Sequence, residues 1–253
     1  MDLSEVQALQ AAGLPLRRHP WEICRARLLR DWLRGLSLCS PVVLDIGCGD
    51  AYILDALARS RPELKCIGVD TAYAAPQRTA AGSWLYPELS QVPADLPSPG
   101  LVTLMDVIEH VPDDLQLLRD LREQGWIRPG ARVFVTVPAF QQLFGKHDEL
   151  LGHFRRYNSL QLRQLLEQAG LRVERVGYWF FLPLLVRCME IARERLLGVG
   201  EEKSGLVAWR QGSAVSKILA AILYVESRIS GALGRFLGVT IGGLTCYAVC
   251  SVE

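Results

Sequence analysis

The chain lacks a marked excess of charge of either sign. Its 253 residues include 28 lysines and arginines and 27 aspartates and glutamates, which leaves a formal net charge of +1. Proteins that bind nucleic acid through its phosphates need an excess or a cluster of basic residues. The balance therefore argues against nucleic acid as a partner, and the length is enough for one α/β domain with an insertion.

The cysteines lack the pattern of a disulfide framework or a zinc site. They are seven in number, scattered between positions 24 and 250, and contain no C-x-x-C pair. We therefore expect free thiols in a reducing compartment, the cytoplasm. The first residues contain Asp2 and Glu5 and no apolar run, so we expect no signal peptide there.

The sequence also lacks the third glycine of the dinucleotide-binding pattern G-x-G-x-x-G. Residues 45–51 read D-I-G-C-G-D-A, and they follow an apolar run that begins at Val42. The aspartates on either side of the glycines would repel a pyrophosphate, but they suit a ligand that carries an amine and a sulfonium. Gly47 and Gly49 have no Cβ, so the backbone of this turn can approach a ligand closely.

A further acidic residue closes the next expected strand. Asp70 follows the apolar stretch 65–69 and lies 21 residues after Gly49. An aspartate at the carboxyl end of that strand is placed to accept hydrogen bonds from two ribose hydroxyls. The two segments together predict a nucleoside-binding turn between a buried parallel strand and a helix.

These residues resemble the first motif of the class I S-adenosylmethionine (SAM) dependent methyltransferases, D-x-G-x-G-x-G, with Ala51 in place of the third glycine. Residues 101–111 (L-V-T-L-M-D-V-I-E-H-V) resemble the fourth strand of that family and the loop after it, and residues 128–138 resemble the start of the fifth strand. The resemblance implies SAM as cofactor and S-adenosylhomocysteine as product. It implies a cofactor site formed by Asp45, Gly47, Cys48, Gly49, Asp70, Thr71, Asp106 and Val107.

The expected fold is a doubly wound α/β fold of the Rossmann-like methyltransferase type, with a seven-stranded, mostly parallel sheet and a helical insertion before the last strand. We expect strands at 42–46, 65–69, 83–86, 101–105, 131–137, 171–178 and 243–250, and a loop at 87–100. The expected parts are an N-terminal helical cap (1–40) with a helix from His19 to about Leu36, the SAM-binding core (41–178), the insertion (179–240) and the final strand (241–253).

A second group of candidate residues lies directly after the presumed fifth strand, at the carboxyl edge of the sheet where ligands bind. Residues 147–157 read H-D-E-L-L-G-H-F-R-R-Y, and the string H-D-x-x-L-G-H-x-R-R-Y resembles a subset of these methyltransferases. Arg155, Arg156 and Tyr157 are candidates for binding an anionic or carboxylate-bearing acceptor. The alternative is a solvated charged loop before a helix that Asn158 and Ser159 cap.

A base is needed only if the methyl acceptor must lose a proton. For a hydroxyl acceptor the candidates are His110, His147 and His153, and for a carboxylate or phosphate no base is required; the sequence leaves this choice open. Oxygen is the expected target atom. We expect no metal, because Asp106, Glu109 and His110 come from one short run, which rarely supplies enough ligands in the right directions.

About 65 residues separate the last two presumed strands, where the family usually has a tight hairpin. Residues 179–186 are apolar, and residues 213–233 carry apolar residues at helical spacing. Arg187, Lys217, Glu226 and Arg228 interrupt both segments, so neither is expected to span a membrane. A pair of amphipathic helices is expected instead, which would form extra core, a homodimer face, a lid over a hydrophobic acceptor, or a peripheral contact with the inner face of the membrane.

The expected function is methyl transfer from SAM to a small or amphiphilic, lipid-linked acceptor. The alternative is a membrane-associated regulatory or scaffold protein that binds SAM without methyl transfer, although the first glycine motif is too intact for an obvious degenerate enzyme. A nicotinamide dehydrogenase would require the longer glycine pattern.

Overall fold

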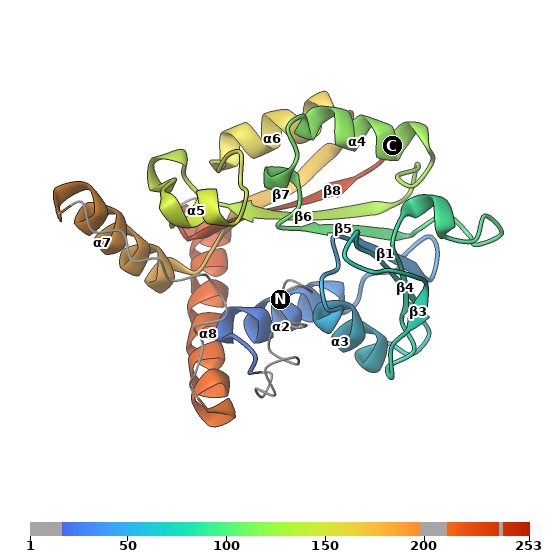
Figure 1. The fold of residues 1–253 in the computed structure, drawn as a ribbon, viewed down its shortest axis with the longest axis horizontal. Helices are drawn as coiled ribbons and strands as arrows, with labels where there is room; N and C mark the ends of the chain where they lie inside the picture. Colours follow the sequence, from blue (N-terminus) through green and yellow to red (C-terminus); the bar gives the residue numbers. More distant parts are fainter. Residues whose placement is uncertain (1–16, 198–211, 238–239) are drawn as a thin grey trace.

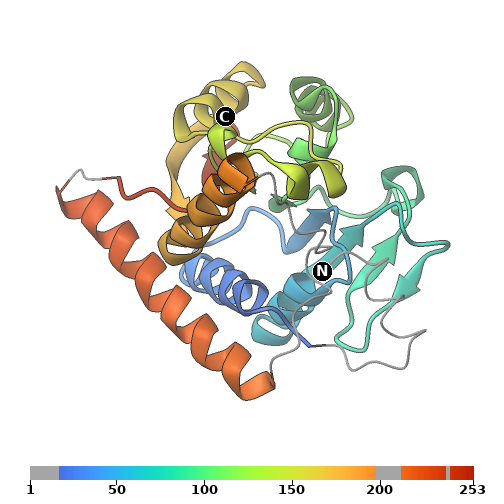
Figure 2. The same ribbon diagram turned by 60° about the vertical axis from the view of Figure 1, so that its left-hand side comes forward.

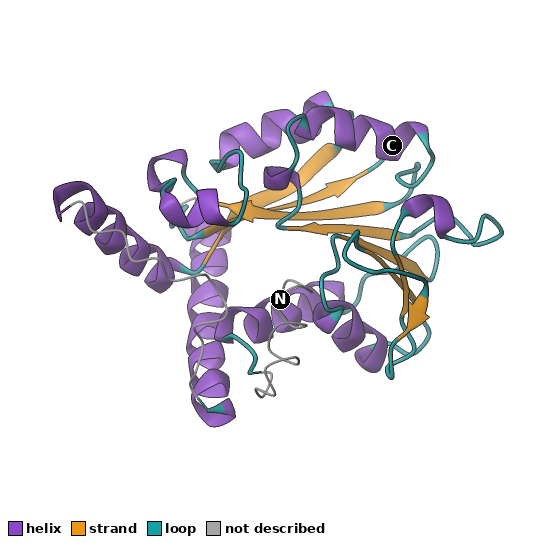
Figure 3. Ribbon diagram, viewed as in Figure 1, coloured by secondary structure: helices purple, strands orange, loops and turns teal. Residues whose placement is uncertain are grey.

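The computed structural model describes residues 17–197, 212–237 and 240–253. Parts of the expected N-terminal cap (1–16) and of the expected insertion (198–211 and 238–239) lie outside the described residues. The described chain forms one mixed sheet between two layers of helices (Figures 1 and 3). The expected α/β architecture is therefore confirmed.

The sheet has eight strands in the order β3-β4-β2-β1-β5-β6-β8-β7. Strands β4, β2, β1, β5 and β6 run parallel, and β8 lies antiparallel between β6 and β7. The strands are β1 (Val42–Ile46), β2 (Lys65–Val69), β3 (Gln77–Arg78), β4 (Trp84–Tyr86), β5 (Leu101–Met105), β6 (Arg132–Pro138), β7 (Arg172–Trp179) and β8 (Thr245–Ser251). All seven expected strands are confirmed to within two residues. The expected strand number misses β3, a two-residue exposed edge strand that is too short for an apolar pattern.

Helices α4 (Asp114–Glu123) and α6 (Ser159–Gln168) cover one face of the sheet, and α2 (Pro20–Leu33), α3 (Tyr52–Ser60) and α8 (Ser213–Leu237) pack on the other (Figure 1). Alternate residues of β1 serve the two layers, because successive side chains of a strand point to opposite faces: Val42 and Leu44 pack under α4 and α6, and Val43 packs under α2 and α3. The structure also has the helices α5 (Lys146–Leu150) and α7 (Phe181–Leu197).

Helix α2 begins at a capping box and ends just before a glycine. The His19 side chain accepts a hydrogen bond from the Trp21 N–H, and the Glu22 carboxylate accepts one from the His19 N–H at 3.2 Å. Such a reciprocal cap satisfies amide groups that the first helical turn leaves free. The helix ends before Gly35, whose φ is +78°, so it stops short of the expected Leu36.

The insertion leaves the sheet at the carboxyl end of β7, as expected, and forms α7 and α8. Glu226 of α8 accepts hydrogen bonds from the Phe181 and Leu182 N–H groups, and so caps the start of α7. Helix α8 crosses α2 (Figures 1 and 2), where Leu223 is buried and the Tyr224 hydroxyl donates to Asp31 at 2.6 Å. None of the described helices is long and apolar enough to cross a membrane.

The outward face of α8 is apolar, and its inward face contains polar residues. Ser216 and Ser227 are 2% and 4% exposed, whereas Ile218 and Ile229 are 61% and 55% exposed. Helix α7 also has exposed apolar side chains. We call the two sets together the insertion face: Leu182, Leu185, Val186 and Met189 on α7, and Val215, Ile218, Leu219, Ile222, Val225 and Ile229 on α8. The helical spacing of the apolar residues in 213–233 is thus confirmed, but these side chains do not form core within the described chain.

Candidate functional site

The glycine turn between β1 and α3 has a left-handed backbone at three positions. The φ angles are +68° at Gly47, +51° at Gly49 and +59° at Ala51. A side chain in this region costs about 1–2 kcal/mol, so the first two positions favour glycine and Ala51 carries a modest strain. A Cβ added at Gly47 would lie 2.6 Å from Cγ2 of Val107, which shows how closely this turn approaches the loop after β5.

Asp70 holds the glycine turn from the end of β2. Its Oδ2 accepts the Gly49 N–H at 2.8 Å, and its Oδ1 accepts the Ala72 N–H at 3.0 Å. Each carboxylate oxygen has a second lone pair for a further donor such as a ribose hydroxyl. The exposed Thr71 lies in the same turn. Tyr73, which the sequence did not single out, donates its hydroxyl to the Gly49 carbonyl at 2.6 Å.

Asp45 and Cys48 lie beneath the turn. Asp45 is buried and accepts a hydrogen bond from the Thr103 hydroxyl at 2.6 Å. Burial raises the pKa of Asp45 to about 7, and the charge of Asp70 adds to the effect. Burial, followed by the charges of Asp45 and Asp70, also raises the pKa of the Cys48 thiol.

Asp106 lies at the carboxyl end of β5 with a left-handed φ of +59°. Its Oδ1 accepts the Thr136 hydroxyl at 3.0 Å, and its Oδ2 forms an ion pair with Arg25 of α2. Arg25 is a site residue that sequence reasoning missed, because nothing in the spacing of the basic helix distinguishes it. It ties the N-terminal helix to the edge of the sheet where Gly47, Asp70 and Asp106 meet.

The histidine loop, residues 139–157, folds back over the loop after β5. The Phe154 N–H donates to the Glu109 carbonyl at 2.8 Å. This contact brings His153 beside His110, with ring centroids 4.6 Å apart in an edge-to-face arrangement. His147 lies on α5, where burial, followed by the charge of Arg187, lowers its pKa. The structure therefore pairs two of the three candidate bases at the sheet edge.

Asp148 organises the histidine loop. The sequence did not identify it as a functional residue, although it belongs to the string H-D-x-x-L-G-H-x-R-R-Y. It is fully buried and accepts hydrogen bonds from His153 Nδ1 at 2.9 Å, Arg156 Nε at 2.7 Å and the Gly145 N–H at 3.0 Å. Burial opposes its charge, but the bonds from His153 and Arg156 outweigh burial and lower the pKa of Asp148 to about 2. Arg187 of α7 approaches the same carboxylate at 3.4 Å, which attaches the insertion to the loop.

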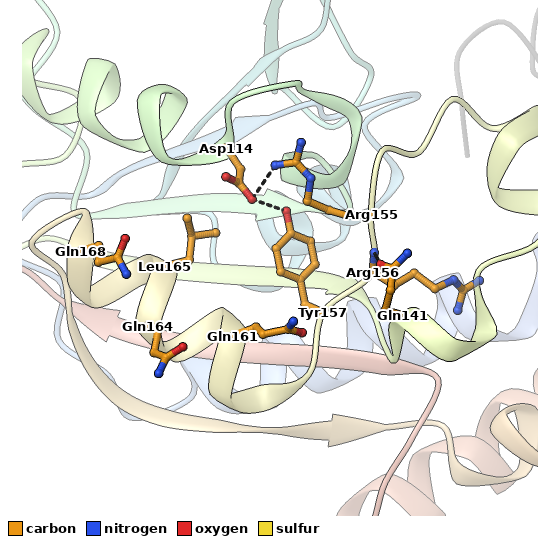
Figure 4. A pocket seen from close by; sticks show the side chains of 9 residues that line it. All are labelled: Asp114, Gln141, Arg155, Arg156, Tyr157, Gln161, Gln164, Leu165 and Gln168. Atoms are coloured by element: carbon orange, nitrogen blue, oxygen red, sulfur yellow. Dashed lines mark hydrogen bonds and ion pairs between the residues drawn. The ribbon is translucent and has the colours of Figure 1, made fainter.

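The three proposed acceptor residues divide between two environments. Arg156 and Tyr157 are both buried. Arg156 pairs with Asp148, whereas Tyr157 and the partly exposed Arg155 both bind Asp114, at 2.6 Å and 2.9 Å (Figure 4). A pocket of about 300 Å³ opens beside this pair, next to α6. Its lining is Asp114, Gln141, Arg155, Arg156, Tyr157, Gln161, Gln164, Leu165 and Gln168. The expected cap by Asn158 at the start of α6 is confirmed: its side chain accepts the Gln161 N–H at 2.8 Å.

The glycine turn on β1, the aspartate after β2 and the sheet order with β8 inserted before β7 define a nucleoside-binding α/β protein of the methyltransferase type. The sequence agrees with this class. Residues 21–176 match the family model of a methyltransferase domain, which is more than half of the chain. The chain belongs to this family of SAM-dependent methyltransferases.

Individual relatives support the same family. The chain is 30% identical over 141 residues to a probable S-adenosylmethionine-dependent methyltransferase of Mycolicibacterium smegmatis, with 52% of each chain covered. It is 30% identical over 125 residues to the ubiquinone biosynthesis O-methyltransferase of Aeromonas salmonicida, covering 42% of this chain and 48% of the relative. The match thus spans about half the length of these curated relatives.

Solved structures share the fold. A putative sarcosine dimethylglycine methyltransferase from Galdieria sulphuraria superposes with a TM-score of 0.54 at 14% identity, covering 99% of this chain and 98% of that one. The plantazolicin methyltransferase BpumL, solved with a monoazolic desmethylPZN analogue and S-adenosylhomocysteine, superposes with a TM-score of 0.53 at 11% identity, covering 92% of this chain and 85% of that one. At such identities the likeness concerns the fold alone.

Proposed function

We propose that this protein transfers the methyl group of SAM to an oxygen of an amphiphilic, lipid-linked acceptor at the carboxyl edge of the sheet. The observation that carries the choice of acceptor is the insertion face, because it joins the same edge through Arg187 and Asp148. An apolar surface of this extent is unusual on a protein unless a ligand, a bilayer or a partner covers it.

In this proposal Asp70 accepts hydrogen bonds from the ribose hydroxyls, and Gly47 and Gly49 let the cofactor lie against the backbone. Support comes from the two backbone N–H groups that fix the Asp70 carboxylate and from the close packing of Gly47 on Val107. Asp106 ends the neighbouring strand and, with Arg25, borders the methionine end of the cofactor.

The reaction is a displacement in line with the sulfonium: the bond from the acceptor oxygen to the methyl carbon forms as the carbon–sulfur bond breaks, and S-adenosylhomocysteine leaves. Positioning two reactants in this way supplies up to about 7–11 kcal/mol of the barrier reduction. For a hydroxyl acceptor we assign the promotion of proton loss to the cluster around His110 and His153. Support comes from the orientation of His153 by Asp148, at 2.9 Å. His147 is not part of this cluster in the proposal.

Arg155 and Tyr157 are proposed to orient a polar head group of the acceptor. Support comes from the pocket beside them and from the exposure of Arg155, which is partial even in its ion pair with Asp114. Arg156 is proposed to hold the loop together, because both its burial and its partner Asp148 are those of a structural ion pair.

Exposed basic residues on the insertion helices also favour contact with a membrane. Arg193, Lys217 and Arg228 are exposed on α7 and α8. An apolar face with flanking cations favours peripheral binding to a bilayer that contains anionic lipid. The expected contact is reversible, since neither helix can span the bilayer.

The test of methyl transfer uses SAM with a deuterated methyl group, incubated with the protein and a lipid extract, followed by intact-mass analysis. The expected result is the gain of one labelled methyl group on an amphiphilic compound, and a strongly reduced yield of that product with the Asp70→Ala variant at low SAM concentration. SAM binding without any labelled product would instead favour the regulatory or scaffold function.

The test of the insertion face is co-sedimentation with vesicles of phosphatidylglycerol and phosphatidylcholine. We expect the triple variant Ile218→Ser, Ile222→Ser and Ile229→Ser to lose vesicle binding. The matched control changes Leu160 and Trp84 to serine, because both are exposed apolar residues outside the insertion. A stable dimer of the native chain that the triple variant dissociates would assign the face to a second copy instead.

A further inference from the structure

Glu109 is the most unusual buried group at the sheet edge. It is 0% exposed, and neither of its carboxylate oxygens has a hydrogen-bond partner among the residues that the structure describes. Buried carboxylates are normally hydrogen-bonded, paired with a cation or bound to a metal, because desolvation without a partner is costly. The unmet acceptor capacity of Glu109 therefore points to a ligand.

The neighbours of Glu109 supply further metal ligands. One carboxylate oxygen of Glu109 and one ring nitrogen each of His110 and His153 all lie within 4.8 Å of one another. Asp106, by contrast, is engaged by Arg25 and Thr136. The third ligand thus comes from the histidine loop, 43 residues further along the chain than His110, and not from the short run 106–110.

A hydrogen bond from His153 to Asp148 orients one of the candidate ligands. Histidines that bind a metal usually donate their other ring N–H to a carboxylate or carbonyl, which fixes the ring and raises its basicity. Asp148 accepts from His153 Nδ1 at 2.9 Å, and so leaves Nε2 for a cation. Glu109 is buried, His153 is half-buried and His110 is exposed, so the cluster is closed on one side and open on the other.

We propose that Glu109, His110 and His153 bind one divalent first-row transition metal ion. Two imidazoles and one carboxylate suit Zn²⁺, Co²⁺ or Fe²⁺ better than Mg²⁺ or Ca²⁺, which prefer oxygen ligands. The role of the ion rests on the proposed function. The acceptor hydroxyl binds the ion on the open side of the cluster, and the ion lowers the pKa of that hydroxyl, so that the hydroxyl loses its proton before methyl transfer.

The test is titration of the metal-free full chain with Co²⁺, whose visible absorption bands report its ligands. We expect one equivalent to bind, and Glu109→Gln and His153→Gln each to weaken binding at least tenfold. His147→Gln is the matched control, since it removes a histidine from the same loop and leaves the cluster intact. Circular dichroism of each variant checks that the chain still folds.

A second ligand tests whether the open side of the metal site can bind an oxygen atom. Acetohydroxamate, a bidentate oxygen ligand, should shift the Co²⁺ bands of the native chain. No Co²⁺ binding at millimolar metal, or equal binding by all the variants, would overturn the metal site, and unchanged bands with acetohydroxamate would overturn its role toward the acceptor. SAM affinity, measured by calorimetry on the same samples, separates the metal site from the proposed function. SAM binding without Co²⁺ binding would refute only the metal site. A native chain that does not bind SAM would refute the proposed function.

Discussion

Replacement of Asp45 by asparagine should make the protein more stable at neutral and alkaline pH. The carboxyl group is buried beneath the glycine turn, and its pKa is raised from 3.8 to about 7 mainly by desolvation. Since the folded pKa exceeds the unfolded one, the stability that Asp45 contributes is fully present below about pH 4. It is lost as the pH rises toward 7, because the unfolded chain ionises freely and the folded chain does not.

The size of the effect follows from the pKa shift. One pKa unit corresponds to about 1.4 kcal/mol, so a shift near three units makes the free energy of unfolding fall by about 2–3 kcal/mol between pH 5 and pH 8. The asparagine side chain of the Asp45→Asn variant cannot ionise, yet its oxygen can still accept the Thr103 hydroxyl. The difference between the native chain and this variant should therefore grow by that amount across this range.

Urea unfolding of both proteins without ligand, at pH 5, 6, 7 and 8, measures the difference, and the other titrating groups cancel in the comparison. Thr103→Val provides a second check: it removes the hydrogen bond that lowers the pKa of Asp45, so the pH dependence should move to higher pH. If the difference in free energy of unfolding between the native and Asp45→Asn chains stays constant with pH, the pKa of Asp45 is not raised by burial and the reasoning is wrong.

Substitutions in three further parts of the site, namely the glycine turn, Asp70 and the arginine pair, give further tests. Gly47→Ala should lower the free energy of unfolding by about 1–2 kcal/mol through its left-handed φ, plus the clash with Val107, and the added Val107→Ala change should recover the clash part in a double-mutant cycle. Asp70→Ala should weaken SAM binding by about 1.5–3 kcal/mol in calorimetry, and equal affinities would remove Asp70 from the cofactor site. Arg156→Ala should destabilise the chain by about 1.5–3 kcal/mol in urea unfolding, because it removes one charge-assisted hydrogen bond from the buried Asp148, which keeps His153, the Gly145 N–H and Arg187 as partners. Arg155→Ala, which breaks a partly exposed pair, should cost less than about 1 kcal/mol.

The parts of the molecule that the sequence predicted are those with strong local signals. The strands of the core are continuous apolar runs bounded by turn residues, and the glycine turn with Asp70 has a fixed spacing. The cap that Asn158 provides for α6 acts within one turn of helix. Each of these features depends on residues that are near one another in the chain, so a single sequence suffices to find them.

The parts that the sequence did not predict depend on contacts between distant segments. Arg25 meets Asp106, and Arg187 meets Asp148, only after the sheet brings α2 and α7 to its carboxyl edge. Glu226 was taken as a charge that interrupts an apolar helix, whereas it caps the start of α7. Helical spacing showed that α8 has an apolar face, but not that this face points away from the core.

The position of β8 has a consequence for how the sheet assembles. Strand β7 has β8 as its partner, and β8 is made only after residues 180–244. Loop closure across roughly 65 residues costs only about 2 kcal/mol more than closure of a five-residue hairpin, so the insertion is a small thermodynamic burden. During synthesis, however, β7 can pair with β8 only after the whole insertion has been made. Until then β7 is an unpaired strand next to two helices with apolar faces. A chaperone or a membrane surface that covers these helices during synthesis would protect the growing chain at this stage.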